Sequence, residues 1–560
     1  MAAINSRTLF ITTSPRTPAK MIPEIALLAE HFTGQKWNNE TQRAFMEVLG
    51  EKDFFFGTGE NEPDFSARDR ITRSPKALGF VALKPTIQLT PAGERLLHSR
   101  RTDEIFLRQM LKFQLPSPYH KPTAKAAKFR IKPYLEFLRI IRTLGSLRFD
   151  ELQIFAMQLT NWHDFDKIIA KIEKYRQDVA SSSLTYKQLK AQYLKNELMR
   201  IYAKRIASGK TKTRETKDAS LEKFLETKAK NLRDYADAAV RGLRATGLVK
   251  VSHKGHTLSI VPERVEDVDY ILSNVNRNPR LFKKEADYIA YLGDATIPAL
   301  YTDNREALLQ KIHREFDSFV VDEHLDIENL KDLFADLLEQ RKIDALQEQI
   351  RQIKDYRLYD DIQNTFQQIE DKELYDTPLM LEWNTWRAMT MLDGGEIHAN
   401  LNFDDYGMPR STAQGNMPDI VCDYGDFSVS VEVTMLPGQK QYETESEPVS
   451  RHLGKLKKET GKTAYCLFIA PSINEACIAH FYTLQKYTVE YYGGTSVIIP
   501  MRLSVFRKMV EDSYNVLYTP SPAQVRKFFE LSEKIAEESV SEQEWYQKIT
   551  EAALHWLEIR

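Results

Sequence analysis

The sequence has few cysteines and no long apolar run, and both absences limit the kind of protein it encodes. Its 560 residues include three cysteines, Cys422, Cys466 and Cys477. An odd set without a C-x-x-C pair does not indicate a disulfide framework or a zinc site, so we expect three buried thiols. No apolar stretch approaches the roughly 20 residues that cross a bilayer, and residues 1–20 lack the apolar core of a secretory signal. The sequence therefore predicts a cytoplasmic protein with no membrane role.

Acidic residues are scarce in the first half of the chain, and basic residues are scarce in the second. The net charge of −1 hides this difference. Residues 1–260 hold 46 Lys and Arg against 27 Asp and Glu; since the whole chain has 78 and 79, the remainder holds 32 against 52. A positive region joined to a negative one is typical of a nucleic-acid-binding region attached to another activity. The length favours several domains, so recognition and chemistry can be separate.

One segment of the basic half has the clearest winged-helix pattern. Apolar residues recur at helical spacing over 231–245 and are followed by two expected strands, 248–251 and 257–261, with a turn at Lys254 and Gly255. Basic side chains of this segment would decorate its outer surface and contact DNA. They are Arg233, Arg241, Arg244, Lys254 and His256.

A second hairpin is expected nearer the N-terminus, over residues 79–89. Thr90 follows it as a helix N-cap, and Pro91 begins a helix over 91–97. Just upstream, Arg68 and Arg70 form a pair that could reach phosphates or a guanine edge. This segment is a second candidate for DNA contact.

Two further segments of the basic half fit the same interpretation. Residues 134–144 and 149–159 have a helix-turn-helix pattern, which a small helical bundle also shows, and residues 204–217 form a basic loop suited to phosphates or a solvated linker. We therefore predict two winged-helix-like DNA-recognition subdomains, over residues 1–115 and 116–265.

A stretch without glycine or proline, residues 299–377, follows the basic half. Its apolar residues recur every three or four positions from 322 to 376, which predicts long amphipathic helices. We predict a helical connector over residues 266–376. A partner-binding coiled coil is the alternative interpretation.

The candidate chemistry follows the connector. Asp419 precedes an expected strand over 420–424, and a second strand over 427–433 delivers Glu432 near its end. Two carboxylates brought together by a hairpin, with the carbonyl of Val433, would supply the oxygen ligands that Mg²⁺ requires, and Mn²⁺ is expected to substitute. Such an ion promotes phosphodiester hydrolysis. The alternative is a pair of acidic residues at a surface turn.

The surrounding pattern supports an α/β core. Glu445 and His452 lie on an expected helix, Glu382 lies on another helix among tryptophans, and apolar strands are expected at 464–470 and 496–499. This order of strands and helices predicts a mixed sheet of the PD-(D/E)xK nuclease type over residues 377–560. The fold prediction is a multidomain α+β protein.

Several longer segments resemble the AlwI family of type IIS restriction endonucleases and related strand-nicking enzymes. In the C-terminal half they are 415–434 (GNMPDIVCDYGDFSVSVEVT), 443–452 (ETESEPVSRH) and 465–474 (YCLFIAPSIN). In the N-terminal half they are 14–20 (SPRTPAK), 65–70 (FSARDR), the hairpin at Gly79, and 233–247. The resemblance therefore extends over nearly the whole chain.

The resemblance implies an enzyme that reads a short asymmetric site on double-stranded DNA and cuts a few base pairs outside it. It implies that Asp419, Glu432 and Glu445 are the acidic active-site residues, with His452 and Glu382 nearby. The superfamily's usual lysine, two residues after the strand glutamate, is here Thr434. Lys440, Glu445 or His452 would then take its role, or the metal ions alone would activate water.

Cutting both strands requires more than one active site, or sequential nicks. We expect a transient homodimer, with helices within 521–560 as the hypothesised contact, or a second subunit, and a cognate DNA methyltransferase as the genetic partner. The alternatives are a strand-specific nicking enzyme, a DNA-binding regulator with a degenerate nuclease domain, and a structure-specific or RNA nuclease.

Overall fold

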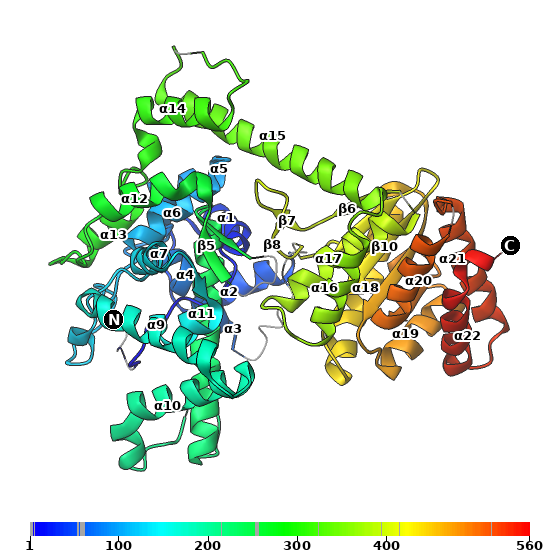
Figure 1. The fold of residues 1–560 in the computed structure, drawn as a ribbon, viewed down its shortest axis with the longest axis horizontal. Coiled ribbons are helices and arrows are strands. Elements are labelled where there is room, and N and C mark those ends of the chain that lie inside the picture. The colour runs from blue at the N-terminus through cyan, green and yellow to red at the C-terminus, as the bar shows by residue number, and fades with distance from the viewer. Residues whose placement is uncertain are drawn as a thin grey trace. The chain divides into compact units, whose positions relative to one another are not determined.

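The chain forms two compact units in a computed structural model (Figure 1). The first spans Met1–Lys52 and Gly57–Leu337, and the second spans Asp53–Phe56 and Leu338–Arg560. The structure describes residues 4, 6–52, 55, 62–213, 215–252, 257–322, 324–393, 395–413, 415–516 and 518–559. None of the helices in these ranges has the length and apolar character that a bilayer-spanning segment requires.

The first unit is mainly helical, with two small sheets. Its helices are α1 (Met21–Phe32), α2 (Asn39–Gly50), α3 (Pro63–Ala67), α4 (Ser74–Ala77), α5 (Pro91–His98), α6 (Thr102–Lys112), α7 (Pro133–Leu144), α8 (Phe149–Ile154), α9 (Phe165–Ser181), α10 (Tyr186–Ala207), α11 (Leu221–Ala245), α12 (Val265–Asn274), α13 (Glu285–Gly293) and α14 (Arg305–Glu315). Its strands are β1 (Val81–Ala82), β2 (Gln88–Leu89), β3 (Leu147–Arg148), β4 (Val249–Val251) and β5 (Thr257–Ile260).

The N-terminal hairpin and its helix cap are confirmed. β1 pairs with β2 in antiparallel register, with Val81 opposite Leu89. The Thr90 hydroxyl accepts a hydrogen bond from Gly93 N at 3.1 Å, and α5 begins at Pro91. The N-cap thus satisfies a backbone donor of the first helical turn, as the sequence indicates.

Two motifs that the sequence presents separately share one three-stranded sheet. β5 lies between β3 and β4, with Leu147 opposite Leu258 and Val249 opposite Ile260. The helix–strand–helix segment α7–β3–α8 is thereby joined to α11 and its hairpin, and α9 and α10 are inserted between them. β3 is two residues long, too short for a periodic pattern to reveal. The predicted turn at Lys254 and Gly255 lies outside the described residues.

The predicted connector is divided between the two units. In the first unit, Lys311 of α14 is buried and lies 2.8 Å from Asp267 of α12. Arg108 of α6 donates to Asp303 at 2.6 Å, so the segment that precedes α15 packs against α6 of the first unit. The long helix α15 (Ile327–Lys354) crosses the boundary between units at Leu337.

The described residues of the second unit form seven α-helices after α15 and the strands of two sheets. Its helices are α16 (Tyr359–Glu370), α17 (Thr377–Asp393), α18 (Gln439–Thr460), α19 (Glu475–Lys486), α20 (Leu503–Asn515), α21 (Pro522–Glu538) and α22 (Glu542–Leu554). Its strands are β6 (Glu396–Ala399), β7 (Asn402–Phe403), β8 (Pro409–Ser411), β9 (Ile420–Asp423), β10 (Phe427–Val433), β11 (Thr463–Ala470) and β12 (Ile498–Arg502).

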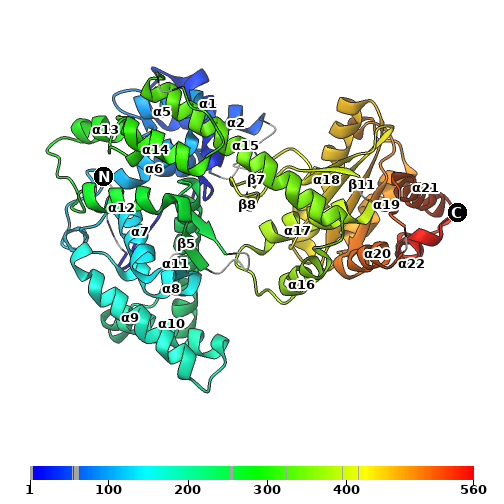
Figure 2. The same cartoon turned by 45° about the horizontal axis from the view of Figure 1, so that its top comes forward.

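A mixed five-stranded sheet forms the centre of the second unit (Figure 2). Its order is β12–β11–β10–β9–β6, with β10, β11 and β12 parallel and β9 and β6 antiparallel to their neighbours. Val429 and Leu467 face Met389 of α17 and Met509 of α20. Because side chains alternate along a strand, Ser430 and Glu432 project to the opposite face, where α18 packs on β10 and β11. The mixed sheet is confirmed, and its edge strand β6 is an addition to the prediction.

Close packing of α18 provides the first testable prediction. A Cβ at Gly454 would lie 2.8 Å from the carbonyl oxygen of Tyr492, so the helix approaches that backbone because position 454 is glycine. Gly454→Ala should lower the free energy of unfolding by about 1–3 kcal/mol, as overpacked sites do, measured by urea denaturation. Glu459→Ala, on the exposed side of the same helix, is the control and should change it by less than about 0.5 kcal/mol. Equal stability of the two variants would contradict this packing.

Candidate active site

Asp419 lies beside the C-terminal end of β10. It directly precedes β9, which runs antiparallel to β10, and its Oδ2 accepts a hydrogen bond from Val433 N at 2.8 Å. The hairpin therefore brings the Asp419 carboxylate next to the strand position that follows Glu432. This is the juxtaposition that the sequence predicts.

Glu432 and His452 share a hydrogen bond in the interior. The Glu432 side chain projects toward α18, and its Oε1 lies 2.8 Å from His452 Nδ1. Both side chains are 8% exposed. The other ring nitrogen of His452, Nε2, is buried and has no hydrogen-bond partner among the described residues. One imidazole nitrogen thus holds Glu432 while the second is left for another group.

Glu445 is joined to the same strand end through Thr434. The Thr434 hydroxyl donates to Glu445 Oε1 at 2.9 Å. Glu445 and His452 are seven residues apart on α18, which is about two turns, so they lie on one face of the helix. The structure therefore gathers Asp419, Glu432, Glu445 and His452 around the end of β10.

Burial dominates the electrostatics of this cluster. It raises the pKa of the Glu432 carboxyl well above its usual range, and the nearby Glu445 raises it further. Burial also raises the pKa of Glu445. It lowers the pKa of His452 to about 4, with a contribution from the positive charge of Arg451, so the imidazole is neutral at pH 7. Two poorly solvated carboxylates without a cationic imidazole are a favourable place for a metal cation.

The donor atoms fit a hard divalent cation in type. Carboxylate oxygens are the ligands that Mg²⁺ and Mn²⁺ prefer, and Asp419 and Glu432 supply them at adjacent strand ends, with Val433 at the same place. No set of three or more His, Cys, Asp or Glu side chains in the described ranges has the arrangement of a metal site. Glu432 is hydrogen-bonded to His452, so this hydrogen bond would have to change before Glu432 Oε1 could bind a metal ion.

The segment before Asp419 is held by α18, which the sequence did not indicate. Asn416 has a left-handed backbone conformation, with φ of 67°. Arg451 donates to its side-chain oxygen, and Lys455 Nζ donates to its carbonyl oxygen at 3.3 Å. Asn400 donates to Pro418 O at 2.7 Å. These contacts position Asp419, and Arg451, beside His452 in the sequence, is the positioning residue that spacing did not reveal.

Glu382 lies on α17 and is buried. Its Oε2 accepts a hydrogen bond from Ala413 N at 3.1 Å. Ala413 belongs to the segment that leads to Asp419, so Glu382 supports that segment from a third element. Its place near the active site and its catalytic role both stay predictions.

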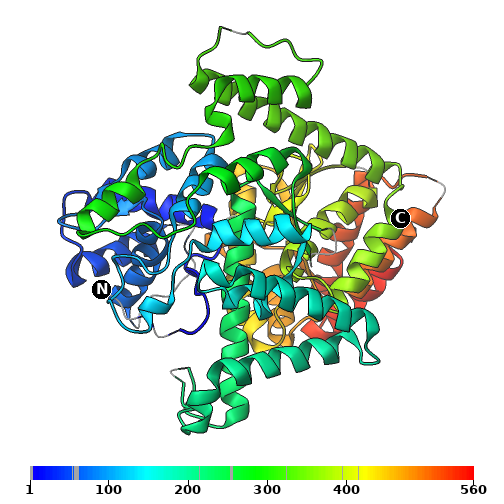
Figure 3. The same ribbon diagram turned by 60° about the vertical axis from the view of Figure 1, so that its left-hand side comes forward.

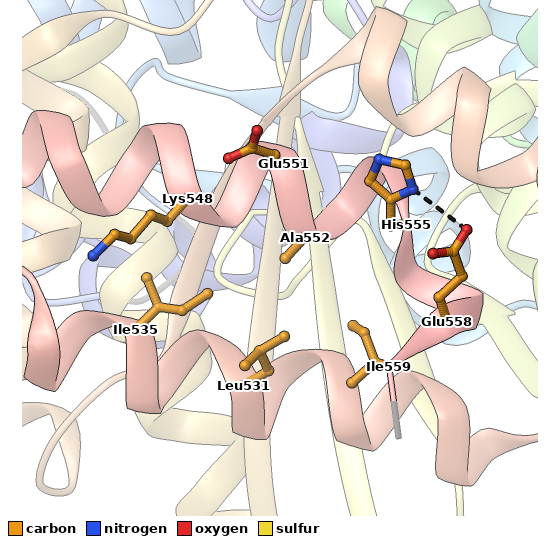
Figure 4. Close-up of a pocket in the computed structure, with 8 residues that line it drawn as sticks. All are labelled: Leu531, Ile535, Lys548, Glu551, Ala552, His555, Glu558 and Ile559. Carbon is orange, nitrogen blue, oxygen red and sulfur yellow. Dashed lines mark hydrogen bonds and ion pairs between the residues drawn. The ribbon is translucent and has the colours of Figure 1, made fainter.

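A groove of about 380 Å³ between α21 and α22 is a separate feature of the second unit (Figure 4). It is lined by Leu531, Ile535, Lys548, Glu551, Ala552, His555, Glu558 and Ile559. None of the predicted catalytic residues lines it.

The three cysteines form no disulfide. All are buried free thiols, as predicted.

Arg68 and Arg70 of the first unit differ in their surroundings. Both lie in the π-helical turn Arg68–Arg73. The Arg68 side chain is 49% exposed and lies 3.4 Å from Asp64. Arg70 forms an ion pair with the buried Glu24. Arg68 is therefore the more accessible of the two for DNA.

The predicted basic residues of α11 are only partly on the surface. Arg233 is exposed, and Arg241 is paired with Asp237 at 3.2 Å. The prediction that Arg244 decorates the outer surface is wrong, because it is 9% exposed and lies one turn after the buried Val240. Lys254 and His256 lie outside the described residues.

The family of the chain follows from a comparison of sequences. A family described as AlwI restriction endonuclease matches residues 76–509. The chain belongs to the AlwI restriction endonuclease family. It is thus a site-specific nuclease that binds DNA, and the AlwI family match includes Asp419, Glu432, Glu445 and His452. A search of curated proteins finds no match.

Three solved structures are similar to parts of this AlwI-family chain. The small subunit R.BspD6I2 of the heterodimeric restriction endonuclease R.BspD6I is 25% identical, with a TM-score of 0.28, over 35% of this chain and 96% of that one. The BpuJ1 endonuclease binding domain, in complex with pyrene- and phenanthrene-modified DNA, is 14% identical, with a TM-score of 0.34, over 49% and 92%. Restriction endonuclease FokI is 12% identical, with a TM-score of 0.25, over 94% and 99%. The family assignment rests on the sequence match.

The buried carboxyl of Glu432 predicts a characteristic dependence of stability on pH. Because its pKa is raised in the folded chain, ionisation opposes folding, and stability is lost as the pH rises above the ordinary carboxyl range. Glu432→Gln should therefore raise the free energy of unfolding of the metal-free protein at pH 8 by roughly 1–3 kcal/mol, and the gain should shrink toward pH 5.

Urea denaturation in EDTA at several pH values measures this effect. Glu443→Gln, which removes an exposed carboxylate from the same helix as Glu445, should leave stability nearly unchanged across the range. A Glu432→Gln protein that is less stable than the unaltered chain at pH 8 would contradict the prediction.

Proposed function

We propose that this restriction endonuclease is of the type IIS kind: it reads a short asymmetric site on duplex DNA and cuts a few base pairs outside it, with Mg²⁺ as cofactor. The observation that carries the proposal is the convergence of Asp419, Glu432 and Glu445 at the end of β10. The order of α17, β6, β9, β10, α18 and β11 supports a PD-(D/E)xK layout for the second unit.

The side chains at the end of β10 have different roles in the proposed hydrolysis. Asp419 and Glu432 would hold Mg²⁺, or Mn²⁺ in its place, and the bound ion would neutralise charge on the phosphate and acidify a water molecule. Glu445, whose pKa burial raises, is a stronger base than an exposed carboxylate, and the Thr434 hydroxyl orients it. His452 is neutral at pH 7, so it orients Glu432 through Nδ1 and offers Nε2 as a hydrogen-bonding site.

DNA recognition is assigned to the first unit. The order α7, β3, α8, α11 and the β4–β5 hairpin supports a winged-helix arrangement, with α9 and α10 as an insertion. Exposed Arg233 and Arg68 are the predicted DNA-contacting arginines that this unit leaves accessible. Base contacts by arginine in a groove would provide the sequence preference.

One set of catalytic carboxylates cuts one strand at a time. We expect a second copy, a second subunit or sequential nicks for a double-strand break, and a cognate methyltransferase that protects the host site. A contact through helices within 521–560 stays a prediction. Strand-specific nicking is the second candidate.

Plasmid cleavage tests the proposal. Supercoiled plasmid with the purified chain and Mg²⁺ should be cut at a fixed distance from a shared short motif, as shown by sequencing the ends. Asp419→Ala should lower the cleavage rate by about 10³-fold or more, since a metal ligand contributes several kcal/mol to the transition state. The control is Asp423→Asn, at the other end of β9, where the carboxylate pairs with Lys462 at 2.8 Å.

The products distinguish the alternatives. Only nicked circles would favour a strand-specific nicking enzyme. Intact plasmid, despite tight DNA binding, would favour a DNA-binding protein with a degenerate nuclease domain. Cleavage without a shared motif, or of RNA, would overturn site-specific DNA cleavage.

A further inference from the structure

A helical arm of the first unit carries charge that the proposed function does not use. It comprises α10, residues 208–220 and the first part of α11 as far as Lys230. In two views its lower end extends away from the rest of the first unit (Figures 1 and 3). The two helices pack through Tyr202 and Phe224, whose ring centroids are 5.4 Å apart. The arm is thus a pair of packed helices rather than an irregular surface loop.

Seven exposed lysines on this arm make no ion pair within the part of the chain that the structure describes. They are Lys187, Lys195, Lys204, Lys210, Lys212, Lys217 and Lys230. Two acidic groups of the arm are paired with lysines outside this set: Glu197 binds Lys171 at 2.9 Å, and Glu226 binds Lys223 at 2.7 Å. The arm therefore presents an excess of uncompensated positive charge.

The two arginines of the arm that the structure describes, in contrast, form hydrogen bonds within the fold. Arg200 donates to Gln158 at 2.5 Å and to Glu197 at 2.7 Å. Arg205 donates to the carbonyl oxygens of Lys210 and Lys212 at 2.5 and 2.7 Å. The described part of the arm thus presents mainly unpaired lysine ammonium groups, whereas Arg200, although exposed, and Arg205 are hydrogen-bonded within the fold. An ammonium group is a flexible point charge that suits phosphates, whereas base edges are read mainly by bidentate arginine and amide groups.

The loop at the end of α10 is held in shape. Arg205 fixes the backbone at Lys210 and Lys212, and the Thr211 hydroxyl donates to Ala219 O. Because these bonds use carbonyl oxygens, the lysine side chains at 210 and 212 are left to project. These bonds fix the backbone at residues 210–212, and both interpretations of residues 204–217, a phosphate-binding loop and a solvated linker, stay predictions.

We propose that the arm binds the sugar-phosphate backbone of duplex DNA without regard to its sequence and adds affinity to the base-reading elements. The chain belongs to a restriction endonuclease family, so a polyanion of this kind is its substrate. The arm also leads directly to the recognition residues, since exposed Arg233 follows Lys230 at a spacing of one helical turn. The inference rests on the proposed DNA binding by the first unit. It does not depend on the proposed catalytic residues or on cleavage outside the recognition site.

Salt dependence of binding tests the arm. We would measure fluorescence anisotropy of labelled duplexes in EDTA, so that cleavage does not contribute, for the full chain and for the triple variant Lys204→Gln, Lys210→Gln, Lys212→Gln. Each phosphate contact contributes about 0.9 to the slope of log K against log salt, so the slope should decrease by about 2–3. The loss of affinity should be the same for a random-sequence duplex and for one that contains a mapped cleavage site.

A second triple variant provides a matched control. Lys167→Gln, Lys174→Gln and Lys223→Gln remove equal charge, two from α9 and one from the arm itself, but these lysines are paired with Asp164, Asp178 and Glu226. Its slope should change by less than about 1. An unchanged slope in the arm variant, or equal changes in the two variants, would overturn the proposal. A loss confined to the cleavage-site duplex would also overturn it, because the arm would then read bases. No DNA binding by the unaltered chain would overturn both this inference and the recognition role of the first unit.

Discussion

The burial of a carboxylate on the central sheet constrains the second unit more than any other feature. Glu432 occupies a strand position that is otherwise suited to an apolar residue, and removing an ionised group from water costs several kcal/mol. His452 satisfies one of its oxygens, so α18 must lie on this face of β10. Gly454 permits the close approach of that helix to the backbone of Tyr492, and Arg451 of the same helix holds the segment before Asp419. The need to satisfy the buried Glu432 carboxyl thus fixes the position of α18 on the sheet.

Two carboxylates of the candidate site could be proposed from local sequence, because Asp419 and Glu432 flank a hairpin whose two strands have clear limits. Glu445, in the second turn of α18, was proposed from the family resemblance instead. The contact between Arg451 and Asn416 could not be predicted, since it joins residues 35 apart through a left-handed backbone turn. Nor could the neutral state of His452, because its pKa depends on burial by packed helices.

The fold shows the same division between local and distant information. Thr90, with proline after it, fixes a helix start by itself, and the hairpin before it was predicted correctly. Strand β3 was not, because two residues carry no period and its partner β5 lies about 110 residues later, far beyond the reach of loop-length patterns. Arg244 was misplaced for a related reason: its own helix suggests a surface position, but tertiary packing buries it. Long-range pairing, rather than propensity, decides these cases.

The boundary between the two units falls inside α15, at Leu337, and not in a flexible linker. A fragment of the first unit that stops there would end inside a helix, without a C-cap and with freshly exposed carbonyl groups. A chimaeric nuclease that joins another domain to this chain within α15 would therefore need a junction that keeps the helical register on both sides. An exchange that adds or removes one residue would rotate every later side chain of α15 by about 100° relative to the earlier ones.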